Sequence, residues 1–400
     1  MSIEGSKVKY QQERFDGGLN TKAGLGNLAP HESPDLLNVV FDNEGAVASR
    51  DGSSIFNTQA VGTCTIDNGT SFLTTMIVWA NGSMYRASNT TFVTIPSAQC
   101  AYVSGAKVAY SIYQNILFSS DGTNGPYKYD GTNFFNISCG TGATCTANTG
   151  GAGSLSTGTY YYKIAYVNTQ VVEFQASSNS TGATLTTSGS VSLTGIGVGA
   201  TSLGVNARYV YRASGSAAGT YLRIATIADN VTTVYHDTIA NGSEGTAQPI
   251  TDGTKPTPWT TVTQDQERLW FDDSSDRSIL RYTELGNPFI SKALSFIPIG
   301  KGDGSNITCL FPGQDLMGVV KSNSLWLIIY NGNTADTGWY RHRSEFDIGA
   351  VSAFGFAKTK LGTVYLGKER NKISGFPLFT GIDIKLASDK KVLLNYISDR

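Results

Sequence analysis

The chain has 400 residues, enough to bury a large core and to form two or three domains. Its 45 glycines, 20 tyrosines and 18 phenylalanines, with only 15% charged residues, favour short strands joined by tight turns, so the sequence predicts an all-β fold. The formal net charge of −1 gives no sign of the basic face with which proteins grip nucleic acid.

No apolar run is long enough to cross a membrane, and the first ten residues lack the apolar core of a signal peptide. We therefore expect folding in cytoplasm and no membrane partner. The five cysteines form no CxxC pair. Reduced, buried thiols are the simpler expectation, and a local bridge between Cys139 and Cys145 is the alternative in an oxidising compartment.

The first 38 residues are expected to form an extended arm. Gly17 and Gly18 allow a backbone turn with positive φ. Leu19 and Leu28 are isolated apolar residues among Gly, Ala, Asn and Thr. This pattern suits an arm that lies on another protein surface.

Residues 39–140 are predicted to form short strands joined by turns. Asn81-Gly82 is a strong two-residue hairpin sequence, and Asp-Gly pairs follow at 121–122 and 130–131. The expected strands are 39–41, 46–50, 72–79, 83–88, 91–95, 107–111, 116–119, 127–129 and 134–137.

Two units of this region match each other. Tyr85-Arg86 is followed by Phe92, and Tyr127-Lys128 is followed by Phe134 at the same offset, which is a shift of 42 residues. A period of about 40–45 residues with four short strands is typical of a β-propeller blade. We therefore interpret residues 39–140 as the first propeller blades.

Residues 141–258 are rich in Gly, Ser, Thr and Ala, and they are predicted to form an inserted β-sandwich of immunoglobulin or fibronectin-III type. Over residues 160–168, Tyr160, Tyr162, Ile164 and Tyr166 point to one face of a strand, and Lys163 and Ala165 point to the other. Tyr209 and Tyr211 share a strand face, with arginines 208 and 212 on the other. The expected strands of the insert are 160–168, 184–193, 209–212, 221–227 and 232–235.

Blade-like sequence resumes over residues 259–400. Turn signals again separate short apolar runs, so the sequence predicts that the remaining propeller blades lie here. The expected strands are 268–271, 279–283, 296–300, 317–321, 324–330, 351–357, 363–367 and 372–376.

Enzyme motifs are lacking in the sequence. It contains no GxSxG elbow and no HExxH pair, and its three histidines are distant from cysteine pairs. The glycine-rich segment 195–199 is not followed by a predicted helix, which disfavours a nucleotide loop. We therefore expect no catalytic residue, no metal and no cofactor.

Carboxylates leave two alternatives open. The acidic loop Asp272–Asp276 offers oxygen ligands for Ca²⁺, although a solvated loop is the simpler interpretation. Glu267, Asp272, Glu284 and Asp303 can supply the acid pair of a propeller glycosidase, but sequence spacing does not show which of them face each other.

Arg341 and Arg343, with His342 between them, form the tightest basic cluster of the chain. They can contact DNA phosphates in a channel, or pair with Glu345 and Asp347. Pairing is the favoured interpretation.

Two regions resemble one protein family in the order and spacing of their motifs. The motifs of the first region are Phe15-Asp16-Gly17-Gly18-Leu19-Asn20-Thr21, Pro34-Asp35-Leu36-Leu37-Asn38-Val39, Phe41-Asp42, Gly45-Ala46 and Arg50-Asp51-Gly52. The motifs of the second region are 266–271, 282–288, 323–326 and 348–352. Both resemble bacteriophage tail nozzle proteins, also called packaged-DNA stabilisation or tail hub proteins, of short-tailed phages.

The resemblance implies a non-enzymatic virion protein with a β-propeller fold. By resemblance, six copies form a ring in the tail, below the portal and its adaptor protein. The ring extends the DNA channel, retains packaged DNA without sequence recognition, and docks tail spikes, fibres or a needle. The arm residues expected to contact a neighbouring subunit or the adaptor are Phe15, Gly17, Gly18, Leu19, Asn20, Leu28 and Pro34.

The main alternative is a host-surface adhesin whose insert binds a glycan by stacking sugars on aromatic rings. A propeller glycosidase is the third hypothesis. It differs from the others in requiring two facing carboxylates.

Overall fold

The structure is a computed structural model that describes residues 66–386 with short gaps, together with four strands before residue 50. The gaps are 89–90, 96–99, 249–252, 314–315, 331–338, 345–347, 360–361, 370–371, 376 and 380–383. The chain divides into two compact units, residues 1–56 with 386–400 and residues 57–385. The account below mainly concerns the second unit.

The described residues form an all-β protein of several antiparallel sheets, as the composition predicts. Apart from strands, the described part contains the short 3₁₀ turn η2 (Thr201–Leu203). In this part of the chain, no helix is long and apolar enough to cross a membrane.

Four short strands precede residue 50. β1 (Gly18–Leu19) pairs in parallel with β2 (Glu32–Ser33), and β3 (Val39–Phe41) pairs antiparallel with β4 (Val47–Ser49). The β3–β4 pair confirms the strands predicted for 39–41 and 46–50.

Two four-stranded antiparallel sheets follow, each with its strands hydrogen-bonded in chain order. Their strands are β5 (Ile66–Phe72), β6 (Thr75–Ala80), β7 (Ser83–Ser88) and β8 (Thr91–Thr94), then β9 (Ala109–Tyr113), β10 (Ile116–Ser120), β11 (Tyr127–Tyr129) and β12 (Phe134–Asn136). Asn81 and Gly82 have φ of 51° and 70°, as a two-residue hairpin turn requires. The single strand predicted for 72–79 is wrong, because the chain turns at Leu73 with φ of 52°.

The 42-residue repeat corresponds to equivalent strand pairs. Tyr85 pairs with Thr94 between β7 and β8, and Tyr127 pairs with Asn136 between β11 and β12, which is the same pair moved by 42 residues. Both pairs are the third and fourth strands of their sheets. The sequence repeat therefore reflects a repeated strand register.

Further sheets follow the insert. Their strands are β20 (Gly253–Thr254), β21 (Val262–Asp265), β22 (Arg268–Asp273), β23 (Asp276–Tyr282), β24 (Ser291–Lys292), β25 (Phe296–Pro298), β26 (Ile307–Pro312), β27 (Leu316–Lys321), β28 (Leu325–Tyr330), β29 (Trp339–Arg343), β30 (Gly349–Ala350), β31 (Phe356–Thr359), β32 (Gly362–Tyr365), β33 (Gly367–Glu369), β34 (Lys372–Gly375), β35 (Pro377–Phe379) and β36 (Ile384–Leu386). Strands β21, β22, β23 and β25 form one four-stranded sheet, and β26 to β29 form the next. The strand predicted for 351–357 is wrong in its first half, since β31 begins at Phe356.

Consecutive four-stranded sheets pack on each other through shared apolar clusters. Within one strand, alternate residues enter different clusters: Leu117 packs toward β5–β8, whereas Phe118 packs toward β21–β25. Trp270 likewise packs toward β26–β29, whereas its neighbour Phe271 packs toward β9–β12. Because both faces of these central sheets are covered, β10 and β22 are buried along their whole length.

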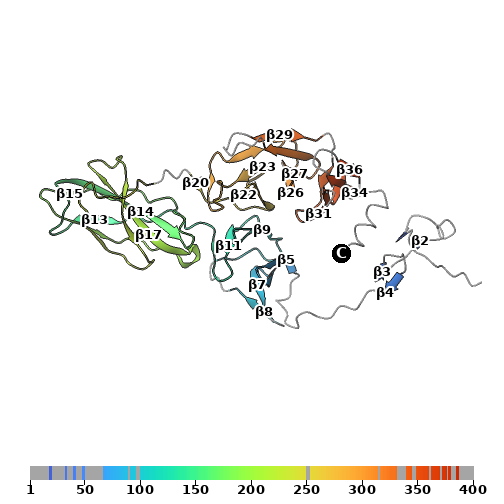
Figure 1. Cartoon of the computed structure of the whole chain (residues 1–400), viewed down its shortest axis with the longest axis horizontal. Coiled ribbons are helices and arrows are strands. Elements are labelled where there is room, and N and C mark those ends of the chain that lie inside the picture. Colours follow the sequence, from blue (N-terminus) through green and yellow to red (C-terminus); the bar gives the residue numbers. More distant parts are fainter. Residues whose placement is uncertain are drawn as a thin grey trace, which may run out of the picture. The chain divides into compact units, whose positions relative to one another are not determined.

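The insert, whose strands lie between residues 146 and 237, consists of two sheets around its own core (Figure 1, green). Its strands are β13 (Thr146–Thr149), β14 (Gly158–Asn168), β15 (Ala183–Leu185), β16 (Val191–Thr194), β17 (Val205–Ser214), β18 (Leu222–Ile227) and β19 (Tyr235–Asp237). One sheet has the order β13-β16-β19 and the other β15-β14-β17-β18. The single strand predicted for 184–193 is wrong, because it comprises β15, a turn and β16 in different sheets.

Arginines on β17 lie within the insert. Arg208 and Arg212 occupy the face of β17 that also carries core residue Val210, opposite Tyr209 and Tyr211, as the alternation predicts. Both arginines are nonetheless buried, at 0% and 2% exposure. Each is therefore compensated by an acidic partner.

These ion pairs join β17 to β19 and to the segments on either side of β19. Arg208 Nη2 lies 3.0 Å from the Asp229 carboxylate, and Arg212 Nη1 lies 2.8 Å from that of Asp237. Arg212 also pairs with Glu244, which ties the segment after β19 to β17.

The four described cysteines are buried, and none of them forms a disulfide with another described cysteine. Cys139 and Cys145 are therefore not bridged, which agrees with the expectation of reduced, buried thiols. Burial raises the pKa of the Cys139 thiol to about 12 and that of Cys145 to about 11, so both are protonated near neutral pH. Cys64 lies outside the described residues.

The packing of β22 gives a stability prediction. Leu269→Ala removes a side chain with 0% exposure and is expected to lower the free energy of unfolding by about 2–5 kcal/mol. The matched control Leu294→Ala alters a side chain with 84% exposure and is expected to change it by less than about 0.5 kcal/mol. Chemical denaturation measures both, and equal effects would contradict the packing described here.

Candidate functional site

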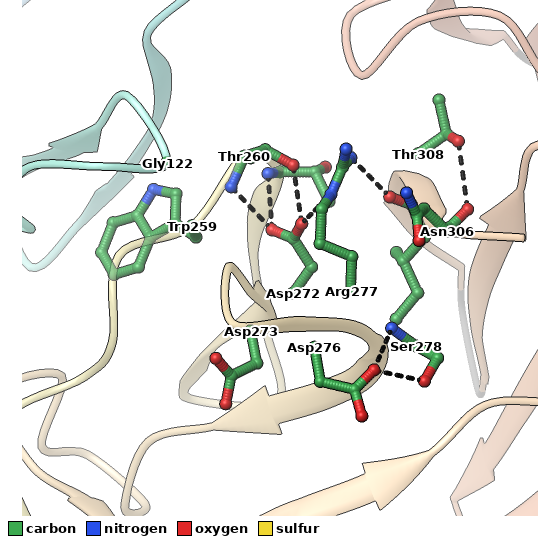
Figure 2. A network of polar contacts seen from close by, with 12 residues as sticks. Gly122, Trp259, Thr260, Asp272, Asp273, Asp276, Arg277, Ser278, Asn306 and Thr308 are labelled. Atoms are coloured by element: carbon green, nitrogen blue, oxygen red, sulfur yellow. Dashed lines mark hydrogen bonds and ion pairs between the residues drawn. The ribbon is translucent and has the colours of Figure 1, made fainter. Parts of the chain in front are cut away.

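Asp272, at the end of β22, is the centre of a buried polar network (Figure 2). Its Oδ1 accepts the backbone N–H groups of Thr260 and Thr261 at 2.7 and 2.8 Å. Its Oδ2 accepts the Thr260 hydroxyl at 2.6 Å and Arg277 Nε at 3.1 Å. A carboxylate offers about four acceptor positions, so Asp272 is saturated by its own chain.

The network joins three consecutive sheets. Arg277, on β23, donates from Nη2 to the Ile307 carbonyl of β26 at 2.9 Å. Trp259 donates its backbone N–H to Ser120 Oγ at 3.1 Å and its indole N–H to the Ala109 carbonyl at 3.3 Å. We call Trp259, Thr260, Thr261, Asp272 and Arg277 the inter-sheet joint.

Gly122 completes the joint at the turn after β10. Its φ is +84°, a conformation that favours glycine, and a Cβ at this position would lie 2.6 Å from Thr260 Cγ2. The turn and the joint therefore lie so close together that a residue with a side chain at position 122 would require rearrangement. The sequence shows an Asp-Gly turn here but does not indicate its contact with residue 260.

The neighbouring aspartates of the acidic loop are also engaged by their own chain. Asp273 accepts Ser275 Oγ at 2.6 Å and Arg281 Nε at 2.5 Å. Figure 2 shows the bond that Asp276 accepts from Ser278 Oγ, at 2.6 Å. Burial opposes ionisation of Asp273, but the hydrogen bonds from Ser275 and Arg281 outweigh it and hold its pKa below the ordinary value. Among the described residues, no group of three or more His, Cys, Asp or Glu side chains can hold a metal ion.

The carboxylates considered for a glycosidase have mostly structural partners. Asp272 is saturated, Glu284 lies 3.3 Å from Lys292 Nζ, and Asp303 lies 2.7 Å from the buried Lys321 Nζ. Glu267 is exposed at the turn between β21 and β22. Three of the four acidic groups therefore hold strands and turns together.

Arg341 and Arg343 lie on β29, an outer strand of its sheet, and both are exposed. Arg341 Nη1 donates to the Pro298 carbonyl of β25 at 2.6 Å, so it links neighbouring sheets. Glu345 and Asp347, the expected partners, lie outside the described residues. The phosphate-contact role remains a prediction.

Of the arm residues, the structure describes Gly18 and Leu19, which form β1. The others lie outside the described residues: Phe15, Gly17, Asn20, Leu28 and Pro34. Their assembly role stays a prediction from the sequence.

Lys128 lies at the contact between the insert and the sheet β9–β12. Its Nζ donates to the Gln170 side chain at 2.8 Å and lies 5.1 Å from the ring centroid of Phe289. The side chain is 3% exposed. Burial lowers its pKa from 10.5 to about 8. Sequence reasoning identified Lys128 only as a repeat position, because its neighbours Gln170 and Phe289 are distant along the chain.

Comparisons with known proteins give little further information. No family model and no curated protein matches the chain. The extracellular domain of the one component system BT4673 from B. thetaiotaomicron is similar at 10% identity and a TM-score of 0.18, over 82% of this chain and 39% of that chain. PorZ, a surface component of the type-IX secretion system of Porphyromonas gingivalis, gives 8% identity and a TM-score of 0.19, over 80% and 57%. The chain thus spans less than two thirds of either, and similarity this low carries no argument about function.

The inter-sheet joint can be tested through Asp272. Asp272→Asn replaces an acceptor with an amide that presents donors to Thr260 and Arg277, so we expect the free energy of unfolding to fall by about 3 kcal/mol. Asp276→Asn is the control, and should change stability little because its pair with Lys301 is exposed. An Asp272→Asn protein as stable as wild type in urea would show that the joint is unimportant.

The lowered pKa of Lys128 predicts that the free energy of unfolding changes with pH in the alkaline range. Its pKa is lowered in the folded state, so between about pH 8 and pH 10.5 the unfolded chain binds the proton and the folded chain does not. Stability relative to Lys128→Met should therefore rise with pH across this window, by about 2–3 kcal/mol. Denaturation of both proteins from pH 7 to pH 10 measures the difference, and a difference independent of pH would refute the lowered pKa.

Proposed function

We propose that the chain is a structural component of a phage virion, a tail nozzle protein that forms a ring below the portal and its adaptor. One observation carries the proposal: the order and spacing of the motifs between Phe15 and Gly52, extended by the motifs at 266–271 and 282–288. The proposal makes the protein a conduit rather than an enzyme.

The sheet arrangement supports a β-propeller architecture for the part outside the insert. Four-stranded antiparallel sheets pack face to face in chain order, and their first strands β9, β21 and β26 lie successively beside one another. This is how the inner strands of propeller blades meet around a centre. In this proposal each four-stranded sheet is a blade.

The insert is proposed to be a β-sandwich of the broad immunoglobulin or fibronectin-III class. It has seven strands in a four-stranded and a three-stranded sheet around one core, as in that class. Its strand order differs from the ABED and CFG sheets of an immunoglobulin constant domain, because the last strand, β19, pairs beside β16. The proposed class therefore rests on the two packed sheets and their shared core, and not on the order in which the strands are connected.

The physical properties of the described residues suit a rigid ring subunit. Hydrogen bonds link consecutive sheets, so each of these sheets is fixed on its neighbours. Closed cyclic symmetry then determines the copy number, which by resemblance is six. A net charge of −1 gives the channel little attraction for DNA, which can pass without sequence recognition.

The partners in this proposal are other copies of the chain, the portal-adaptor protein, and a tail spike, fibre or needle. DNA contacts the ring only in transit. The protein would fold in the host cytoplasm and then join the virion tail through its arm.

Removing the arm tests the proposal. Wild-type protein mixed with portal-adaptor complexes is expected to form closed rings by mass photometry, and a variant lacking residues 1–38 is expected to stay monomeric. Leu19→Asp with Leu28→Asp should act in the same way without a deletion, whereas Leu294→Asp, on an exposed side chain of the second unit, should still assemble.

Unchanged thermal unfolding of the variants would show that they are folded. The proposal is wrong if wild-type protein stays monomeric with the adaptor, or if rings form equally well without the arm.

A further inference from the structure

The aromatic face of the insert is closed by its own cations. On the outer face of the sheet β15-β14-β17-β18, the Arg223 guanidinium lies 4.6 Å from the ring centroid of Tyr209, and Lys163 Nζ lies 4.4 Å from that of Tyr221. A sugar ring stacks on an uncovered aromatic face. These tyrosine faces are therefore a poor site for the glycan that the insert would bind under the adhesin hypothesis.

A pocket of about 250 Å³ lies instead where the insert meets the sheet β9–β12. The turn before β12 and β12 itself contribute Asn133 and Phe135, and the insert contributes Thr169, Thr201 and Asn206, among others. We call this space the junction pocket. Its size is below that of pockets for drug-sized ligands, and suits one small ring.

The pocket wall is held in place from both sides. Gly204 has φ of +61°, and a Cβ there would lie 2.4 Å from the Phe135 ring, so the aromatic ring lies directly against the backbone of the insert. Asn230 binds both the N–H and the carbonyl of Gly199 at 2.8 Å, and Asn133 donates to Asp130 at 3.2 Å. Preorganised groups lose little freedom when a ligand binds.

The chemistry of the pocket favours an uncharged, hydroxyl-rich ligand. None of the residues described as lining it is charged. Thr169, Thr201 and Asn206 make no side-chain hydrogen bond within the described part of the chain, and hydroxyl and amide groups both donate and accept. Phe135 adds an apolar surface. Phosphates, carboxylates and amines would find no opposite charge here.

We propose that the junction pocket binds one ring of a neutral saccharide. Thr169, Thr201 and Asn206 form hydrogen bonds to its hydroxyl groups, and Phe135 contacts its apolar face. The inference is independent of the ring-forming proposal, since it rests on the pocket alone. Because the pocket walls come from both the insert and the sheet β9–β12, bound sugar also stabilises their contact.

Ligand-observed NMR with full-length protein tests the inference. The probes are glucose, galactose and N-acetylglucosamine, with N-acetylneuraminic acid as a charged comparison, each at millimolar concentration. At least one neutral sugar is expected to show saturable binding. Asn206→Ala and Thr169→Ala are each expected to weaken it on the order of fivefold, which is the loss of one hydrogen bond.

Matched controls separate the pocket from the rest of the insert. Asn179→Ala and Thr187→Ala alter exposed side chains that do not line the pocket and should leave binding unchanged. Binding of no neutral sugar, binding of the charged sugar alone, or equal binding by pocket and control variants would each overturn the inference. Because all four substitutions are at partly or fully exposed positions, they test binding in a folded protein.

Discussion

The carboxylate of Asp272 is the constraint on which the packing of the described sheets outside the insert depends. A buried charge is stable only when its hydrogen-bonding capacity is filled, and here the donors come from Thr260, Thr261 and Arg277. Through Arg277 the same group is linked to β26, and through Trp259 the adjoining segment is linked to the sheet before the insert. Any shift of one sheet would leave polar groups unpaired, so the network fixes the relative position of three sheets.

This constraint explains how a long insert is tolerated. The chain leaves the series of sheets after β12 and returns at Trp259, whose indole and backbone groups bond directly to residues of β9 and β10. These contacts of Trp259 therefore fix where the chain rejoins the sheets, whatever the length of the insert. The insert keeps its own core and its own buried ion pairs. Its junction with the sheet β9–β12 includes the Lys128–Gln170 hydrogen bond, the bond from Asn136 to the Ser202 carbonyl, and a shared apolar cluster.

Local features of the fold were predictable from the sequence. The Asn81-Gly82 turn and the alternation around Tyr209 depend on residues close together along the chain, and the repeat that relates Tyr85 to Tyr127 is one local pattern that occurs twice. The joint, the burial of Lys128 and the junction pocket were not predictable, because each brings together segments separated by tens of residues or more. The strand predicted for 72–79 failed for a local reason: Leu73 has a positive φ that its residue type does not signal. The acidic loop was visible in the sequence, but the arginine and serine donors that occupy its carboxylates were not.

The central claim is that the chain is a ring-forming part of a phage tail, and electron cryomicroscopy of the protein with assembled capsid or portal complexes tests it most directly. The account predicts a closed ring with an axial hole at the tail vertex, directly below the adaptor, with each subunit contributing stacked four-stranded sheets. Single copies projecting from the periphery of the tail, with no ring, would contradict it and favour the adhesin alternative.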